Sequence, residues 1–136
     1  MEPMSANRFA RTREDHSREL AEDYCELIQA LIVETGEARV VDLAQRLGVS
    51  SVTVTKTVQR LVRDGYAESK PYRSVFLTEE GRALAESAAD RHRMVLEFLL
   101  ALGVDPQAAE EDAEGIEHHV SEATLAAMRR FLSKGP

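Results

Sequence analysis

The sequence predicts a mainly α-helical protein with a small β-hairpin wing, in which an N-terminal winged helix-turn-helix is followed by a second helical domain. Three observations predict this fold. Apolar residues recur at helical spacing through most of the chain, a glycine turn joins two short helical patterns, and two short strand-like segments follow them. The composition agrees, because only 5% of the residues are aromatic and Trp is absent. A chain of 136 residues is long enough for one domain or two small units.

The first predicted helix runs from about Glu14 to Thr35, and Gly36 supplies a stop signal. Residues 1–13 show no such pattern and are predicted to be a disordered leader. We predict a winged helix-turn-helix domain over residues 14–85 and a second, helical domain over 86–136. The apolar positions of the first helix, at helical spacing, are Leu20, Tyr24, Leu27, Ile28, Leu31 and Ile32.

Two further helical patterns, over residues 39–47 and from about residue 51 to Gly65, are separated by the turn Gly48-Val49-Ser50. Gly48 tolerates the positive φ that such a turn requires, and the small side chain of Ala44 lets the next helix cross closely. We therefore predict a helix-turn-helix. The apolar face of its second helix consists of Val54, Val58, Leu61 and Val62.

The opposite face of that second helix is polar and basic. In a helix-turn-helix, the N-terminal end of the second helix normally enters the major groove, whereas residues nearer its C-terminal end are expected to meet phosphate. Lys56 belongs to the first group and Arg60 to the second. The predicted DNA-contacting residues on this helix are Ser50, Ser51, Thr53, Lys56 and Arg60.

A hairpin with a basic tip is predicted after the helix-turn-helix, with strands over residues 66–69 and 74–78. At the tip, Lys70 and Arg73 can neutralise phosphate charge, and the Tyr72 hydroxyl can donate a hydrogen bond. An ordinary solvated hairpin is the alternative. The position directly after the helix-turn-helix favours contact with DNA.

The net charge of −7 is divided unequally along the chain. Residues 38–73 hold seven basic residues against three acidic ones, a balance of +4, whereas residues 86–136 hold five against ten, a balance of −5. The basic middle is typical of a surface that faces phosphate. The acidic balance of residues 86–136 indicates that this segment has a role other than contact with phosphate.

Three helices are predicted after the hairpin. The first runs from Thr78 to Gly103, and Asp105-Pro106 provides an N-cap and a first-turn proline for the second. A new cap near Ser121 opens the last, whose apolar stripe is Leu125, Met128, Phe131 and Leu132. So few residues with so many apolar faces cannot close a core alone, so we predict a symmetric homodimer.

The segment from Asp112 to His119 contains three carboxylates and two imidazoles within eight residues. On a helix, Glu114, Glu117 and His118 would stand at i, i+3 and i+4 and project from one face. Oxygen ligands combined with imidazole suit Mn²⁺, Fe²⁺ or Zn²⁺, and the lack of thiolate argues against a structural zinc site. The alternative is an acidic helical turn with a histidine near its cap.

Cys25 is the only cysteine, so the chain forms no internal disulfide. The sequence has no apolar N-terminal signal segment and no apolar run long enough to cross a bilayer. We therefore expect a cytoplasmic protein that does not interact with a membrane.

The order of these features resembles the diphtheria-toxin-repressor family, and within it the manganese transport regulators. The resemblance rests on Asp23-Tyr24-Cys25-Glu26 in the leading helix, the winged helix-turn-helix, Arg91-His92, and the run from Glu114 to His119. It covers nearly the whole chain apart from roughly the first dozen residues. We expect no SH3-like third domain of the kind that the larger repressors carry after the dimerisation region, which matches the short manganese branch.

This resemblance implies a divalent cation bound between the first helix and the dimerisation helices, which fixes how two DNA-binding units are held on a palindromic operator. The iron-responsive branch typically has Met and Cys at the positions of Asp23 and Glu114. Hard oxygens there favour Mn(II), at one or two ions per subunit, over Fe(II), Co(II) or Zn(II) as competitors. The implied ligands are Asp23, Glu26, His92, Glu114, Glu117 and His118.

The sequence thus predicts a manganese-responsive, homodimeric regulator that binds double-stranded DNA and represses genes for Mn(II) uptake, rather than an enzyme or a protein with an organic substrate. One alternative is a small dinuclear metal hydrolase, although no nucleophile elbow or phosphate loop accompanies the cluster. Another is a winged-helix regulator that senses an organic ligand. Metal-dependent DNA binding without hydrolysis separates these three functions.

Overall fold

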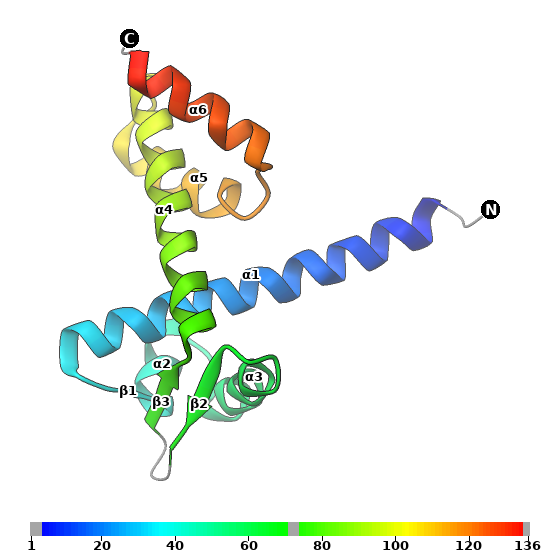
Figure 1. Cartoon of the computed structure of the whole chain (residues 1–136), viewed down its shortest axis with the longest axis vertical. Coiled ribbons are helices and arrows are strands. Elements are labelled where there is room, and N and C mark those ends of the chain that lie inside the picture. Colours follow the sequence, from blue (N-terminus) through cyan, green and yellow to red (C-terminus); the bar gives the residue numbers. More distant parts are fainter. Residues whose placement is uncertain (1–3, 71–73, 135–136) are drawn as a thin grey trace. The chain divides into compact units, whose positions relative to one another are not determined.

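The computed structural model of the chain describes residues 4–70 and 74–134. The chain divides into two compact units, each visible in Figure 1. The winged-helix unit comprises Leu20–Glu86, and the helical unit comprises the residues up to Glu19 together with those from Ser87 onward. In chain order the elements are α1 (Met4–Thr35), β1 (Ala38–Arg39), α2 (Val40–Leu47), α3 (Ser51–Arg63), β2 (Ala67–Ser69), β3 (Ser74–Leu77), α4 (Glu79–Ala101), α5 (Pro106–Ile116) and α6 (Glu122–Lys134).

The helix-turn-helix is formed by α2 and α3, as predicted. Gly48 adopts φ 68°, and its N–H bonds to the Ala44 carbonyl at 2.9 Å, which ends α2. The Ser50 hydroxyl accepts a hydrogen bond from the Thr53 N–H at 3.1 Å and caps α3. Val54, Val58 and Leu61 are buried, whereas Val62, predicted for the same apolar face, is 41% exposed because it lies at the edge of that face.

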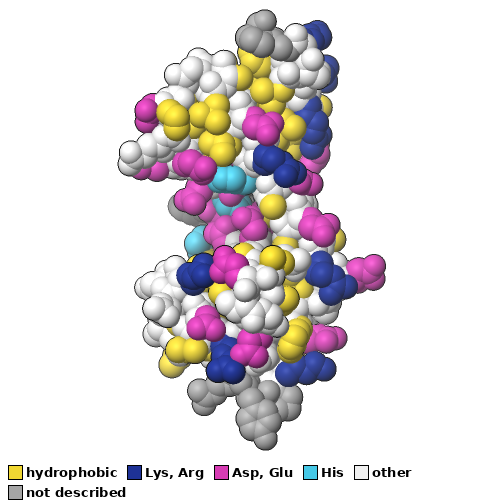
Figure 2. Space-filling view, turned by 90° about the vertical axis from the view of Figure 1, so that its left-hand side faces the viewer, with side chains coloured by type: hydrophobic (Ala, Val, Ile, Leu, Met, Phe, Trp, Pro, Cys, Tyr) yellow, Lys and Arg dark blue, Asp and Glu magenta, His cyan; other side chains and the backbone are white. Residues whose placement is uncertain are grey.

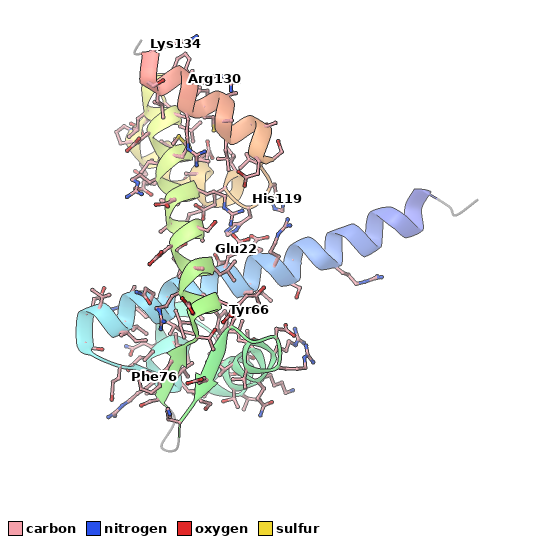
Figure 3. The ribbon with its side chains drawn as sticks, viewed as in Figure 1. Glu22, Tyr66, Phe76, His119, Arg130 and Lys134 are labelled. Atoms are coloured by element: carbon pink, nitrogen blue, oxygen red, sulfur yellow. The ribbon has the colours of Figure 1, made fainter. Side chains whose placement is uncertain are left out.

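The wing is part of a three-stranded antiparallel sheet with strand order β1-β3-β2. The sequence predicted only the β2-β3 hairpin, in which Glu68 pairs with Phe76 (Figure 3). The additional strand pairs Ala38 with Val75. At two residues it is too short to show an alternating pattern of its own. The tip residues Tyr72 and Arg73 lie outside the described part of the chain.

The core of the winged-helix unit joins the second half of α1 to α2, α3 and the sheet. Cys25, Ile28 and Leu43 are fully buried in it.

α1 begins at Met4, about ten residues before the predicted start, and so takes in most of the segment predicted to be a disordered leader. Extending an existing helix costs little once its first turn has formed, so a segment with no apolar stripe can still be helical.

A close backbone contact fixes the start of α4 within the winged-helix unit. The Thr78 hydroxyl donates to the Gly65 carbonyl at 2.6 Å and accepts from the Gly81 N–H at 3.1 Å. A Cβ on Gly81 would lie 2.0 Å from the carbonyl oxygen of Tyr66, which Figure 3 labels. Only glycine fits at this position.

We expect Gly81→Ala to lower the free energy of unfolding by about 1–3 kcal/mol, the usual cost of overpacking. Urea unfolding followed by circular dichroism measures it. The matched control is Gly115→Ala on α5, where an added Cβ meets nothing within 4 Å. That variant should be unchanged or more stable by up to ~1 kcal/mol. Equal stability of the two variants would contradict the importance of the contact with Tyr66.

In the helical unit, α4, α5 and α6 enclose a smaller core around Val95, Ala113 and Leu125. The Asp105 side chain accepts a hydrogen bond from the Ala108 N–H, and Pro106 begins α5, as predicted. Among the residues that the structure describes, no helix is long and apolar enough to cross a membrane. Among the side chains described for this unit, four large apolar ones remain substantially exposed: Leu100, Leu102, Ile116 and Phe131.

Candidate metal centre and DNA-binding face

The helical unit brings three of the predicted metal ligands together. His92 lies on α4, and its Nδ1 is 2.8 Å from a carboxylate oxygen of Glu117. The other oxygen of Glu117 is 3.4 Å from Nε2 of His118. Glu117 and His118 are each only 5% exposed, so one buried carboxylate bridges two imidazoles. Figure 2 shows imidazole atoms beside carboxylates at the molecular surface.

The prediction that Glu114, Glu117 and His118 project from one face of a single helix is wrong in part. α5 ends at Ile116, and Glu117 is its C-cap. The Glu117 N–H still bonds to the Ala113 carbonyl at 3.0 Å, so the chain makes one more turn before α6. The helix ends before the last two of these residues because the following segment must turn back to form a new cap at Ser121, whose hydroxyl accepts from the Thr124 N–H.

His92 has carboxylates at both ring nitrogens. Its Nε2 is 3.2 Å from a carboxylate oxygen of Glu110, a residue that the sequence analysis did not select. Burial lowers the pKa of His92, but the nearby carboxylates of Glu117 and Glu110 outweigh that effect, and the net pKa lies above its ordinary value of 6.5. The protonated imidazole therefore stabilises the metal-free folded state.

This pKa shift predicts how the stability of the metal-free protein depends on pH. The contribution of His92 should be fully present below pH 6.5 and should be lost as the pH rises through the raised folded-state pKa. Urea unfolding of the parent and of His92→Gln, measured in chelator between about pH 5.5 and 8.5, isolates this contribution as the difference between them. The difference should shrink with rising pH, and a difference that grew would contradict the shift.

The remaining predicted ligands occupy other positions. Asp23 and Glu26 lie at i and i+3 on α1, where Asp23 is exposed and Glu26 is partly buried. Glu114 is exposed on α5. Their assignment as ligands stays a prediction from the sequence.

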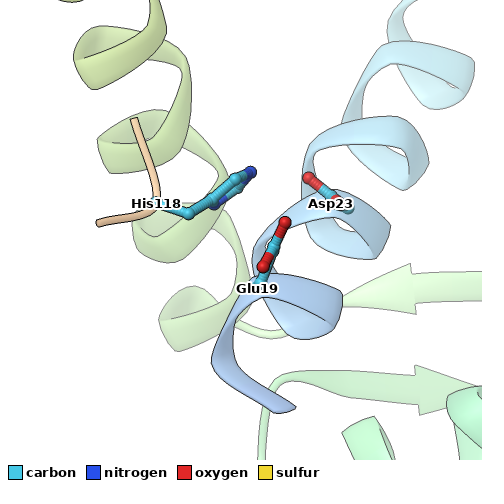
Figure 4. Close-up of side chains that lie close together, drawn as sticks. All are labelled: Glu19, Asp23 and His118. Carbon is cyan, nitrogen blue, oxygen red and sulfur yellow. The ribbon is translucent and has the colours of Figure 1, made fainter. Parts of the chain in front are cut away.

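Glu19 also offers a ligand atom to this centre, although the sequence analysis did not select it. One of its carboxylate oxygens and a ring nitrogen of His118 lie within 4.8 Å of each other (Figure 4). Asp23 stands one turn further along α1, and its oxygen lies within the same distance of Glu19. Glu19 is 3.7 Å from Nε2 of His119. The i, i+4 spacing of Glu19 and Asp23 is the signal that could have identified it.

Cys25 is not available as a metal thiolate. It is fully buried in the winged-helix unit. Burial raises the pKa of its thiol to about 11, and the carboxylate of Glu22 contributes to the same shift. The thiol is therefore protonated at neutral pH and acts as a small packing group.

The described residues predicted to contact DNA lie on the surface of the winged-helix unit. Beside α3 is a groove of about 1090 Å³, whose lining includes Lys56, Thr55, Gln59, Arg39 and Ser69. Thr55 and Gln59 are exposed polar residues that the sequence analysis did not select as DNA contacts. The predicted contacts that are exposed are Ser50, Ser51, Thr53, Lys56, Arg60 and Lys70.

Two family models match the chain. The model for the N-terminal DNA-binding domain of the iron-dependent repressor matches residues 17–75. The model for the metal-binding and dimerisation domain of the same repressor matches residues 78–135. The chain belongs to the iron-dependent repressor family. Its two matched segments meet close to the boundary between the two compact units.

Relatives of this family member include proteins named transcriptional regulator MntR. The chain is 56% identical to the one from Escherichia coli O6:H1 over 126 residues, which cover 93% of the chain and 81% of the relative. The corresponding protein of Salmonella typhimurium is 54% identical, over 93% of the chain and 80% of the relative. The HTH-type transcriptional regulator MntR of Bacillus subtilis is 44% identical over 74% of the chain and 70% of the relative.

Solved structures from metal-dependent regulators share the fold. The manganese regulator SloR matches with a TM-score of 0.73 and 27% identity over 83% of this chain. A manganese-dependent transcriptional repressor in complex with manganese matches with a TM-score of 0.69 and 30% identity over 81% of it. This chain spans about half the length of each, 53% and 51%.

Proposed function

We propose that this protein is a manganese-responsive, DNA-binding transcriptional regulator that represses genes for Mn(II) uptake. The observation that carries the proposal is the pairing of a winged helix-turn-helix with a buried imidazole-carboxylate centre in a second unit. The similarity to transcriptional regulators named MntR, and to the solved structures of a manganese regulator and of a manganese-dependent repressor, supports it. Its site of action would be the cytoplasm, where the operator is.

The chemistry of the donor set supports a hard divalent cation. His92, Glu117 and His118 provide oxygen and imidazole donors, and Cys25 stays protonated in the core. Such donors suit Mn²⁺, although Fe(II), Co(II) and Zn(II) would compete by intrinsic affinity. One or two ions per subunit would use these three residues together with Asp23, Glu26 and Glu114.

Metal binding would organise the protein rather than catalyse a reaction. Ligands on α1, on α4 and after α5 all hold one centre in this proposal, so a bound cation restricts the arrangements that these elements sample. Without the cation, only a fraction of the protein has the arrangement that fits the operator, and the apparent affinity for DNA is reduced by that fraction. A cation that favours this arrangement therefore raises the affinity for DNA. A bound divalent cation supplies the charge that draws the carboxylates together.

A homodimer would present two α3 helices to a palindromic operator. The exposed Leu100, Leu102, Ile116 and Phe131 supply apolar surface in the helical unit for contact with a second copy. The family model for this part of the chain is described as a dimerisation domain. On the winged-helix unit, the basic balance of residues 38–73 would attract the phosphate backbone.

The test is a DNA-binding titration with a metal control. Duplexes are first selected from a random library by binding in the presence of Mn²⁺, and the best is labelled for fluorescence anisotropy. Tight binding with Mn²⁺, and its loss on chelation, is the expected result. Binding that is independent of Mn²⁺, or cleavage of the duplex, would contradict the proposal.

A further inference from the structure

We propose that Glu19 is a further metal ligand, which the ligand set implied by the sequence does not contain. This inference rests on the proposed function, because it concerns the same cation. Glu19 and His118 belong to the same compact unit, and Figure 4 shows that their side chains lie close together.

The geometry allows one cation to contact both groups. Two atoms that bind one cation at about 2.1 Å each are at most ~4.2 Å apart. The Glu19 oxygen and the His118 nitrogen lie within 4.8 Å, so a small rotation of the flexible Glu19 side chain closes the remaining distance. The His118 side chain is 4% exposed and that of Glu19 is 32% exposed, so the cation would be largely screened from water.

The other contact of Glu19 would yield to a cation. Its oxygen lies 3.7 Å from Nε2 of His119, which is too long for a hydrogen bond. The His119 side chain is 54% exposed, and an ion pair at such a site contributes little to stability. Binding of a divalent cation at the same oxygen stabilises the protein by more than the loss of this ion pair destabilises it.

The pattern of charge on α1 gives an independent argument. Glu19, Asp23 and Glu26 stand at i, i+4 and i+7, so three carboxylates share one stripe of the helix. Each carboxylate added to the ligand set favours hard Mn²⁺ over softer metals.

The experiment measures metal binding by the purified full chain in the absence of DNA. The electron paramagnetic resonance signal of free Mn²⁺ gives affinity and stoichiometry, and the visible absorption of bound Co²⁺ reports the number and type of its ligands. We expect Glu19→Gln to weaken Mn²⁺ binding by ~10-fold or more and to change the Co²⁺ spectrum. Glu19→Asp keeps the carboxylate and should recover part of the affinity.

Two controls separate direct binding from indirect effects. Glu34→Gln removes the same charge from an exposed position on α1, where Glu34 pairs only with exposed Arg46 at 2.8 Å among the contacts described for it, and should match the parent. His119→Gln removes the neighbour of Glu19 and should leave the Co²⁺ spectrum unchanged. If His119→Gln reproduced the effect of Glu19→Gln, Glu19 would act through His119 and the inference would be wrong.

Glu117→Gln is measured in parallel to distinguish this inference from the proposed function. Loss of Mn²⁺ binding in Glu117→Gln with parental binding and spectrum in Glu19→Gln would overturn the role of Glu19 alone. Parental binding in both variants would overturn the metal centre itself. Circular dichroism of each variant confirms that the protein is folded.

Discussion

Replacing Glu117 by Gln is expected to abolish Mn²⁺-dependent operator binding while the protein stays folded. The Glu117 carboxylate is buried between Nδ1 of His92, at 2.8 Å, and Nε2 of His118, at 3.4 Å. Loss of its charge therefore removes one proposed ligand and the partner of two others. Loss of even an outer partner of a ligand costs about 10–100-fold in metal affinity, so the Mn²⁺ concentration for half-maximal binding should rise by ~100-fold or more. Fluorescence anisotropy of the selected operator duplex measures it.

Glu111→Gln is the matched control for this variant. Glu111 is exposed on α5 and its replacement removes the same charge from the same region. It should respond to Mn²⁺ as the parent does. Equal loss in both variants would assign the effect to net charge, and a parental response in Glu117→Gln would remove Glu117 from the ligand set.

The helices were predictable from the sequence because their stops and caps are local signals. The positive φ of Gly48 ends α2, the Ser50 hydroxyl caps α3, and Asp105 caps α5, all at positions that the sequence indicated. Strand β1 was not predictable. Its two residues pair with β3 more than thirty residues away, and no pattern within β1 encodes that partner.

The candidate metal centre was predictable in composition but not in geometry. The residue types in the run from Glu114 to His119 indicate a cation, and the resemblance to a known family adds His92 from a distant helix. Helical spacing alone placed Glu117 and His118 inside α5, whereas they follow it, because the end of this helix depends on the turn to α6. Glu110 was missed because only the folded chain brings α5 beside His92.

The two exposed cations of α3 should differ in what they contribute to DNA binding. Lys56 lies in the first half of the helix beside the groove, where we expect its side chain to reach base edges. Arg60 lies in the last turn, where we expect it to meet phosphate. Lys56→Ala should lower the preference for the operator over random DNA by ~1–3 kcal/mol per half-site. Arg60→Ala should weaken binding to both duplexes and reduce the salt slope by about one unit per subunit.

Anisotropy titrations of both variants on operator and random duplexes, at several salt concentrations and saturating Mn²⁺, distinguish these two roles. Both residues are exposed on the same helix. A general loss of helix stability would therefore weaken DNA binding alike in both variants. It would not lower the operator preference in one variant and the salt slope in the other. Two copies of α3 in a dimer should make each effect about twice as large on the full operator as on an isolated half-site. If both variants bound operator and random DNA as the parent does, α3 would not be the helix that contacts DNA.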